Sequence, residues 1–187
     1  ALFWAGRART REGDPAGANT LLQRLLVVRP THPLADDALF LLAENLEDLG
    51  RRPEALEAFA RLERTYPDGE FADAALWRRA WMHIREGRVG QARPLLKILA
   101  GRRASPYATQ ALFWEGRLLE AAGDHDGARQ RFQSAADGAT GDYYAARARD
   151  LLALPLGGPV RSGAIEDAID RAVDLSRGAL ARAEGEP

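Results

Sequence analysis

A repeated pattern of glycines and alanines constrains the fold of this chain more than any other sequence feature. Glycines suited to the end of a helix recur in steps of 37, 37 and 36 residues, at Gly13, Gly50, Gly87 and Gly123. An alanine stands five places after each of them, at Ala18, Ala55, Ala92 and Ala128. Such self-similarity indicates an architecture in which each repeat is one small structural unit that packs on its neighbours. The sequence therefore predicts four repeats over residues 1–137.

The other positions of the pattern predict a pair of antiparallel helices in each repeat. A small residue precedes each alanine by twelve places, and a large apolar residue follows it by four, giving the sets Gly6, Ala43, Ala80, Gly116 and Leu22, Phe59, Leu96, Phe132. Small side chains let two helices approach closely, and a residue four places on lies on the same helix face. Glycine adopts the left-handed conformation that ends a helix at low cost. We therefore expect Ala55 and Ala128 to be buried between the helices of their pairs.

The predicted fold class is all-α, a right-handed superhelix (solenoid) of antiparallel helix pairs, with about ten helices in total. The first helices are expected at residues 1–12, 35–49, 71–86 and 107–122, and their partners at 15–28, 53–65, 89–100 and 125–137. Tyr143–Leu152 is expected to be a ninth helix and Ala164–Ala183 a last one. As domains, residues 1–152 are expected to hold the four repeats and the ninth helix, and residues 164–187 a C-terminal helix with a frayed tail.

One set of positions, Leu39, Ala43, Ala55, Phe59 and Pro67, resembles the tetratricopeptide repeat. That family has a large residue, a small residue four places later, an alanine twelve beyond it, an aromatic residue four after that, and a late proline. Its period is about 34 residues, and the two or three additional residues of this chain fall in the linker after the proline. The resemblance implies a concave surface that is lined by the first helices and binds a segment of a partner protein.

Charge and composition exclude several classes of partner and site. The chain has 26 basic and 27 acidic residues, a net charge of −1, which argues against nucleic acid or an anionic membrane as the main partner. It has no cysteine, so it has neither a disulfide framework nor a thiolate metal site. No apolar run approaches the roughly 18 residues of a membrane span. The chain begins inside a helical pattern at Ala1, and we expect it to be a fragment of a longer protein.

We predict no catalytic, cofactor-binding or metal-binding residues in this chain. Its three histidines lie far apart in the sequence and suit surface or linker positions: His32, His83 and His125. It contains no H-E-x-x-H motif, nucleophile elbow, P-loop or dinucleotide-binding glycine motif. Several acidic residues stand where the start of a helix favours negative charge, so helix capping accounts for Asp14, Asp36 and Asp124.

Aromatic residues recur on the predicted first helices, and two interpretations of them are open. The residues are Phe3, Trp4, Phe40, Trp77, Trp81, Phe113 and Trp114. They either pack between neighbouring repeats or line a groove for a peptide or a sugar chain. Stacking on a sugar needs exposed ring faces, so their exposure decides between the two interpretations.

The last repeat contains the motif FW-x-G-R. G-D, an alanine and a phenylalanine follow this motif, and then a helix that begins with Tyr-Tyr. The residues are Phe113, Trp114, Gly116, Arg117, Gly123, Asp124, Ala128, Phe132, Tyr143 and Tyr144, and the first repeat has part of this combination at Phe3, Trp4, Gly6, Arg7, Gly13 and Asp14. This combination resembles the superhelical, non-catalytic region of bacterial soluble lytic murein transglycosylases. In that family a lysozyme-like domain follows, with its catalytic Glu in a Glu-Ser motif, and no Glu-Ser dipeptide occurs here. The resemblance implies a periplasmic or cell-envelope scaffold that positions the enzyme on peptidoglycan.

Two other functions are weighed against this one. The first is a stand-alone tetratricopeptide adaptor that binds a peptide segment of a partner protein in cell-envelope assembly, since outer-membrane assembly lipoproteins and cell-division coordinators carry similar repeats. The second is an enzyme in its own right, which the missing motifs disfavour. The expected partner is a protein or peptide segment, or peptidoglycan, with no nucleic acid, membrane span or cofactor.

Two rows of side chains on the first helices form the candidate concave binding face. One place after the small residue of each repeat stand Arg7, Glu44, Trp81 and Arg117, and five places after it stand Arg11, Asp48, Arg85 and Ala121. The two rows are one turn apart and project together. Trp and Arg are the side chains most enriched in binding hot spots, so Trp81 beside Arg85 suits a ligand with a carboxylate or a sugar. The alternative interpretation is that these are ordinary solvated residues.

Overall fold

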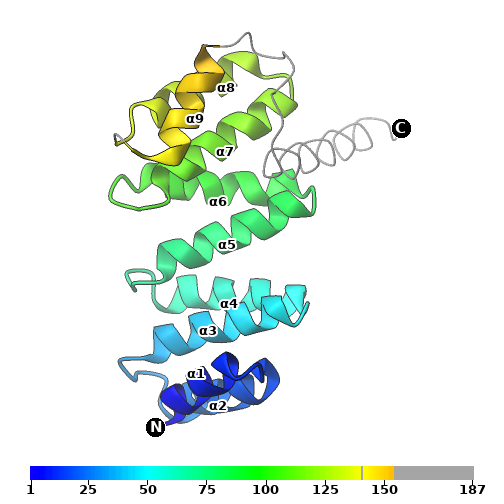
Figure 1. Cartoon of the computed structure of the whole chain (residues 1–187), viewed down its shortest axis with the longest axis vertical. Coiled ribbons are helices and arrows are strands. Elements are labelled where there is room, and N and C mark those ends of the chain that lie inside the picture. The colour runs from blue at the N-terminus through cyan, green and yellow to red at the C-terminus, as the bar shows by residue number, and fades with distance from the viewer. Residues whose placement is uncertain (140, 154–187) are drawn as a thin grey trace, which may run out of the picture. The chain divides into compact units, whose positions relative to one another are not determined.

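The structure of the chain is a computed structural model that describes residues 1–139 and 141–153 (Figure 1). The described residues form α-helices joined by turns and linkers, which confirms the predicted all-α fold class. The helices are α1 Leu2–Arg11, α2 Pro15–Val28, α3 Ala35–Asp48, α4 Arg52–Thr65, α5 Ala72–Arg85, α6 Val89–Gly101, α7 Ala108–Ala121, α8 His125–Ala136 and α9 Tyr143–Leu152. The expected bounds differ from these by at most one residue at each end. The predicted helix Ala164–Ala183 and the tail after it lie outside the described residues.

The chain divides into two compact units, Ala1–Arg79 (unit 1) and Ala80–Pro187 (unit 2). The division falls inside α5, so the first part of that helix belongs to unit 1 and the rest to unit 2. In unit 1, α1 packs on α2, α2 on α3, and α3 on α4. In unit 2, α7 packs on α6, α8 and α9, and α8 also packs on α9. The arrangement of residues 1–152 as one right-handed array stays a prediction.

Glycine turns and aspartate caps set the helix ends. The four turn glycines have φ values between 69° and 81°, a conformation that side chains with a Cβ rarely adopt: Gly13, Gly50, Gly87 and Gly123. Asp14 and Asp124 accept hydrogen bonds from the backbone N–H groups of Gly17 and Gly127, at 2.8 and 2.9 Å, so both cap a helix as expected. Asp36 instead lies in the first turn of α3, where a carboxylate still interacts favourably with the helix dipole.

Small residues bring the helices of unit 1 together. Ala18 of α2 and Ala55 of α4 are fully buried, which confirms the prediction for Ala55. A Cβ atom at Gly6 of α1 would lie 3.0 Å from the side chain of Leu22 in α2. The glycine therefore leaves the space that the close contact between α1 and α2 requires.

A buried polar cluster joins α1, α2 and α3. The Asn45 side-chain amide donates hydrogen bonds to Thr10 Oγ1 at 3.0 Å and to Asn19 Oδ1 at 2.9 Å. Asn19 and Asn45 are both less than 5% exposed. Because a buried amide is costly unless it is hydrogen-bonded, this cluster favours one way of packing α3 on the first helix pair.

Unit 2 repeats the same construction around Phe132. Ala92 and Ala128 are fully buried, which confirms the prediction for Ala128. A Cβ atom at Gly116 of α7 would lie only 2.6 Å from Phe132 Cε1 of α8. The position twelve places before the alanine therefore has to be small in this pair, as the repeat pattern predicts.

Candidate binding surface on the first helices

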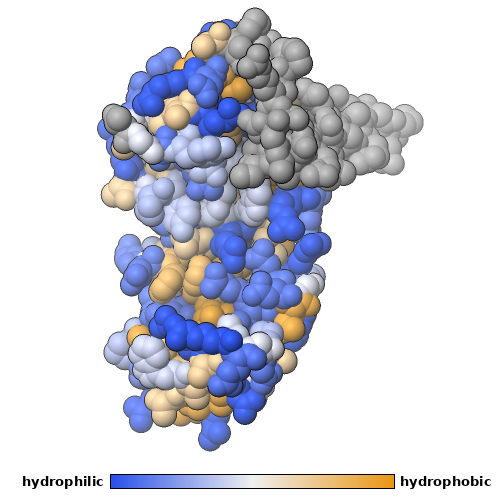
Figure 2. Space-filling view, in the orientation of Figure 1, coloured by the Kyte–Doolittle hydropathy of each residue, from blue (hydrophilic) through white to orange (hydrophobic). Residues whose placement is uncertain are grey.

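The predicted face of unit 1 begins with two arginines on α1. Arg7 and Arg11 are both exposed and lie about one helical turn apart. The Arg7 guanidinium carbon is 5.6 Å from the centroid of the Trp4 ring, which is a cation–π distance, and Trp4 is 58% exposed. Strongly hydrophilic and apolar side chains stand next to each other on the face of unit 1 that Figure 2 shows.

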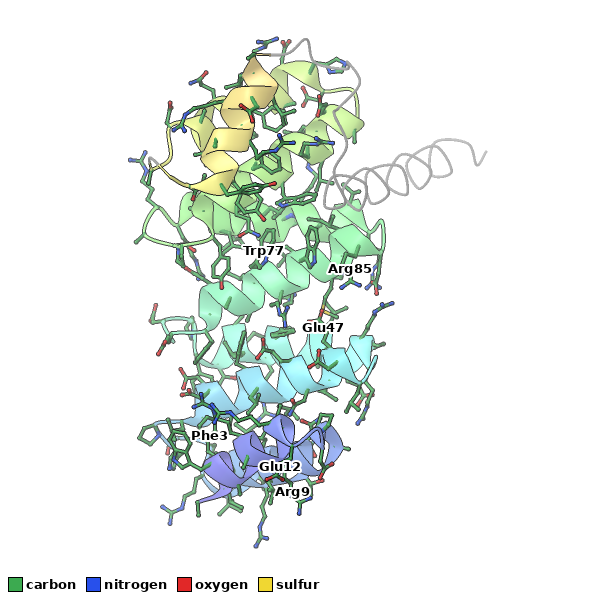
Figure 3. All side chains as sticks on the ribbon, viewed as in Figure 1. Phe3, Arg9, Glu12, Glu47, Trp77 and Arg85 are labelled. Atoms are coloured by element: carbon green, nitrogen blue, oxygen red, sulfur yellow. The ribbon has the colours of Figure 1, made fainter. Side chains whose placement is uncertain are left out.

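The two acidic members of the face, both on α3, differ in their surroundings. Asp48 is exposed, whereas the half-buried Glu44 accepts a hydrogen bond from the Arg78 guanidinium at 3.0 Å. Arg78 Nε is also 3.6 Å from a carboxylate oxygen of Glu47, which Figure 3 labels on α3. Burial raises the pKa of the Glu44 carboxyl, and the charge of Arg78 acts against that rise. Glu44 therefore belongs to an ion cluster and is not an isolated acid.

Arg78 is a member of this surface that the sequence interpretation missed. It stands two places before the small residue Ala80, where the other repeats have Trp4, Leu41 and Trp114. A cation in a row of large apolar residues is the signal that would have found it. The charge of the α3 surface depends on this residue, because it compensates two of the carboxylates.

In unit 2 the candidate residues Trp81 and Arg85 stand near the end of α5. The half-buried Trp81 ring meets the Trp114 ring edge to face, with the centroids 4.8 Å apart. Arg85 is exposed and is labelled at the C-terminal end of α5 in Figure 3. Trp81 thus has a packing role and remains partly exposed, and its use as a binding residue with Arg85 stays a prediction.

Arg117, the last member of the predicted face, is buried and does not present its guanidinium at the surface. Its exposed fraction is 5%, and its Nε atom is 3.6 Å from Glu120 Oε2. Glu115 of the same helix is also buried and pairs with Arg131 of α8 at 3.1 Å. Helix periodicity did not predict this burial because it depends on neighbours, and α7 contacts α6, α8 and α9.

Exposure separates the recurring aromatic residues into two groups. Three of them are at most 5% exposed, which confirms the packing interpretation for Phe3, Phe113 and Trp114. Phe40 is half-buried and stacks on Phe71, with the ring centroids 4.7 Å apart. The residues that keep accessible area are Trp4, Phe40, Trp77 and Trp81.

The part of the chain that the structure describes contains no group of three or more His, Asp or Glu side chains placed to hold a metal ion. None of its helices is both long and apolar enough to cross a membrane.

Antiparallel helix pairs with a repeat of 36 or 37 residues and mixed charges on the first helices define a helical-repeat scaffold. The family model for the tetratricopeptide repeat matches residues 5–70, 46–109 and 78–144. The chain belongs to the tetratricopeptide repeat family. Repeats of this family serve as scaffolds for protein–protein interaction.

Solved structures with this fold come from several sources. A tetratricopeptide repeat protein from Parabacteroides merdae matches with a TM-score of 0.68 at 19% identity, over 97% of this chain and 66% of that one. MamA from Desulfovibrio magneticus gives a TM-score of 0.56 at 17% identity, over 99% and 96% of the two chains. The repeats of a putative kinesin light chain from Podosopora anserina give 0.57 at 14% identity, over 99% and 96%.

These identities are low, so the likenesses concern the fold alone. The chain spans just under two thirds of the Parabacteroides structure. No curated protein matches this chain. The family model and the Parabacteroides structure are named for tetratricopeptide repeats, and the Podosopora structure is named for repeats like them. None of these matches, nor MamA, is named as a lytic transglycosylase.

Proposed function

We propose that this chain is a non-catalytic scaffold that binds an extended segment of a partner protein along its first helices. The observation that carries the proposal is the exposed charge on the first helices of unit 1: Arg7 and Arg11 on α1, and Asp48 on α3. α1 and α3 contact each other, so these side chains lie on neighbouring helices.

The arrangement of the charges supports a protein segment as the ligand. The α1 surface is basic, whereas the α3 surface is acidic, with part of its charge compensated by Arg78. Charges of both signs at fixed places select a partner by complementarity and orient it, whereas a polyanion needs a surface of one sign. The segment that fits has an acidic part against Arg7 and Arg11 and a basic part against Asp48.

In unit 2, taken by itself, Arg85 and the half-buried Trp81 are the proposed contacts. Arginine pairs with a carboxylate in a planar, bidentate way, and a tryptophan edge beside it adds apolar area. Arg117 is not included, because it is buried.

Site-specific photo-crosslinking tests the proposal. A benzoylphenylalanine replaces Arg11 or Asp48 in the full chain, and matched controls carry it at the exposed α4 positions Glu57 and Arg61. The crosslinked peptide is identified by mass spectrometry, synthesised, and titrated against the unmodified chain. We expect the same peptide from the α1 and α3 positions and little from α4. Arg11→Glu should then weaken the binding of the synthetic peptide at least threefold, with no change in the thermal midpoint.

Equal crosslinking from Glu57 or Arg61 would contradict the proposal, because it would place the partner on the second helix of the pair. Unchanged affinity in both Arg11→Glu and Asp48→Arg would also contradict it, since charged contacts that position the segment must affect its binding.

The finer form of the proposal places the scaffold in the periplasm of a bacterium, as the superhelical region of a soluble lytic transglycosylase that is held on peptidoglycan. Its support is the sequence resemblance carried by the FW-x-G-R motif and the Tyr-Tyr helix. Co-sedimentation with purified cell-wall sacculi tests it. We expect the chain to sediment with sacculi without releasing muropeptides, and Arg85→Ala to reduce the sedimented fraction.

The alternative is a stand-alone adaptor in cell-envelope assembly. It predicts that the chain stays in the supernatant with sacculi and still yields the crosslinked peptide. Release of muropeptides by a clean preparation would contradict both forms, because it would make the chain an enzyme.

A further inference from the structure

A hollow in unit 1 lies where two inter-repeat linkers meet. It has a volume of about 600 Å³ and is lined by residues 30–33 of the α2–α3 linker, by Asp36, and by residues 65–69 at the end of α4 and in the α4–α5 linker. Three prolines, Pro30, Pro33 and Pro67, belong to this lining. Proline fixes its own backbone angle, so these linkers lose little conformational freedom when a ligand binds.

Contacts between the two linkers hold the hollow in shape. The Tyr66 hydroxyl donates a hydrogen bond of 2.8 Å to the Pro30 carbonyl oxygen. A Cβ atom at Gly69 would lie 3.1 Å from Tyr66 and 3.2 Å from Asp36 Oδ2, so the Asp36 carboxylate lies against the backbone of the other linker. His32 Nδ1 accepts the backbone N–H of Leu34 at 3.0 Å, which leaves its Nε2 as the protonated nitrogen of the neutral ring.

The charge of the hollow is negative. Asp36 and Asp68 both line it. Several other carboxylates of unit 1 form ion pairs, and none of them lines the hollow: Asp14, Glu44, Glu47, Glu54, Glu57 and Glu63. Burial, followed by the charges of Asp36 and Glu70, raises the pKa of the neighbouring Asp37 carboxyl, and Arg7 acts against this rise. Negative charge therefore accumulates where the linkers meet.

We propose that this linker hollow binds an arginine side chain of a partner protein. A planar guanidinium can donate hydrogen bonds to the carboxylates of Asp36 and Asp68, and it stacks on an aromatic ring such as that of Tyr66. A lysine ammonium is more strongly hydrated and does not stack in this way. A metal ion does not fit, because the described residues hold no group of three or more His, Asp or Glu side chains placed for one. The site is formed by the two linkers and the first turn of α3, and its lining includes none of the first-helix surface residues Arg7, Arg11, Glu44 and Asp48.

A peptide titration followed by NMR tests the proposal with the full ¹⁵N-labelled chain. The probe is the capped pentapeptide Gly-Gly-Arg-Gly-Gly at millimolar concentration. Its matched controls are the same peptide with citrulline, which keeps the shape without the charge, and with lysine. We expect saturable shifts of backbone amides in residues 31–36 and 66–69 with the arginine peptide, and shifts at least threefold smaller with either control.

Variants of the chain separate this site from general charge attraction. Asp68→Asn lies in an exposed linker and should weaken arginine binding at least threefold, as should Asp36→Asn. Glu12→Gln removes an exposed carboxylate elsewhere in unit 1 and should leave the binding unchanged. Arg11→Glu, the variant that tests the first-helix surface, should also leave it unchanged, so failure of one proposal is distinguishable from failure of the other.

Four results would overturn the proposal. Equal shifts with the citrulline peptide would show that charge plays no part, and equal shifts with the lysine peptide would show that the hollow does not select a guanidinium. Shifts confined to α1 and α3, with the linkers unaffected, would place the peptide on the first-helix surface instead. Unchanged affinity in Asp68→Asn, with the fold intact by circular dichroism, would remove the carboxylate contact on which the proposal depends.

Discussion

Gly116→Ala is a small change that tests the close contact within the α7–α8 pair. The added methyl group would lie 2.6 Å from Phe132 Cε1 and 2.8 Å from Phe132 Cδ1. Carbon atoms pack at about 3.5–4.0 Å, so the ring has to move by about 1 Å. Phe132 is 0% exposed and has no solvent-filled space to move into. The substitution therefore overpacks the core of unit 2.

The expected magnitude combines two opposing effects. Overpacking a core costs about 1–3 kcal/mol, whereas replacing glycine within a helix returns about 0.5–1 kcal/mol. The net loss in the free energy of unfolding is then about 1 kcal/mol. The free energy of unfolding of a small protein falls by about 2 kcal/mol for each 1 M of urea. We expect the urea midpoint to fall by about 0.5 M, measured by circular dichroism at 222 nm.

Gly90→Ala is the matched control, with the opposite expected sign. Gly90 lies in α6 of the same unit, and a Cβ atom there would meet nothing within 4 Å. This variant gains the helix preference without the clash, so its midpoint should rise by a few tenths of a molar. If Gly116→Ala unfolds at the same urea concentration as the parent, or at a higher one, Phe132 does not lie close enough to Gly116 to exclude a methyl group.

Three further predictions concern packing and charge. Ala55→Leu should cost about 1–3 kcal/mol, because the alanine is fully buried, whereas Glu57→Gln should change stability by no more than about 0.5 kcal/mol; urea midpoints compare the two. Trp81→Ala should lower the thermal midpoint by several degrees through the lost contact with Trp114, and an unchanged midpoint would make Trp81 purely a surface residue. Asp37→Asn should raise the urea midpoint at pH 7. The pKa of Asp37 is raised in the folded state, so ionisation of this carboxyl costs stability as the pH rises through the folded pKa. The stability advantage of Asp37→Asn should therefore disappear below the ordinary pKa of 3.8. An advantage that persists below that pH would contradict this cause.

The helix pairs could be predicted because their signals are local and repeated. Gly13 and Gly50 adopt the left-handed conformation that the pattern requires, and the buried Ala55 and Ala128 follow from the twelve-residue spacing to a small residue. Because the same pattern occurs in four repeats, the helix ends predicted in one repeat are supported by the other three. The predicted helix bounds therefore agree closely with those of the structure.

The surface was harder to predict because exposure depends on neighbouring elements. Arg117 occupies the same position of its repeat as Arg7, yet it is buried and Arg7 is exposed. Glu44 is paired with Arg78, which lies 34 residues further along the chain. Periodicity within one helix contains no information on such partners.

The linker hollow could not be predicted from the sequence for a similar reason. Pro30 and Tyr66 are 36 residues apart and meet through a single hydrogen bond. Taken alone, the sequence of each linker predicts only the end of a helix, because it contains proline. The concave site forms only where the two linkers come into contact. An acidic residue just after the first of these linkers, Asp36, and another within the next linker, Asp68, are the signal that was present.

Hydrogen–deuterium exchange on the full chain, with and without the crosslinked partner peptide, tests the central claim most directly. A ligand that binds only the folded state slows the exchange of the elements it holds, in proportion to its concentration over its dissociation constant. We expect added protection in Leu2–Arg11 and Ala35–Asp48, the helices α1 and α3, and none in Arg52–Thr65, the helix α4. Protection of α2 and α4 with no change in α1 and α3 would contradict the claim that the first helices form the binding surface.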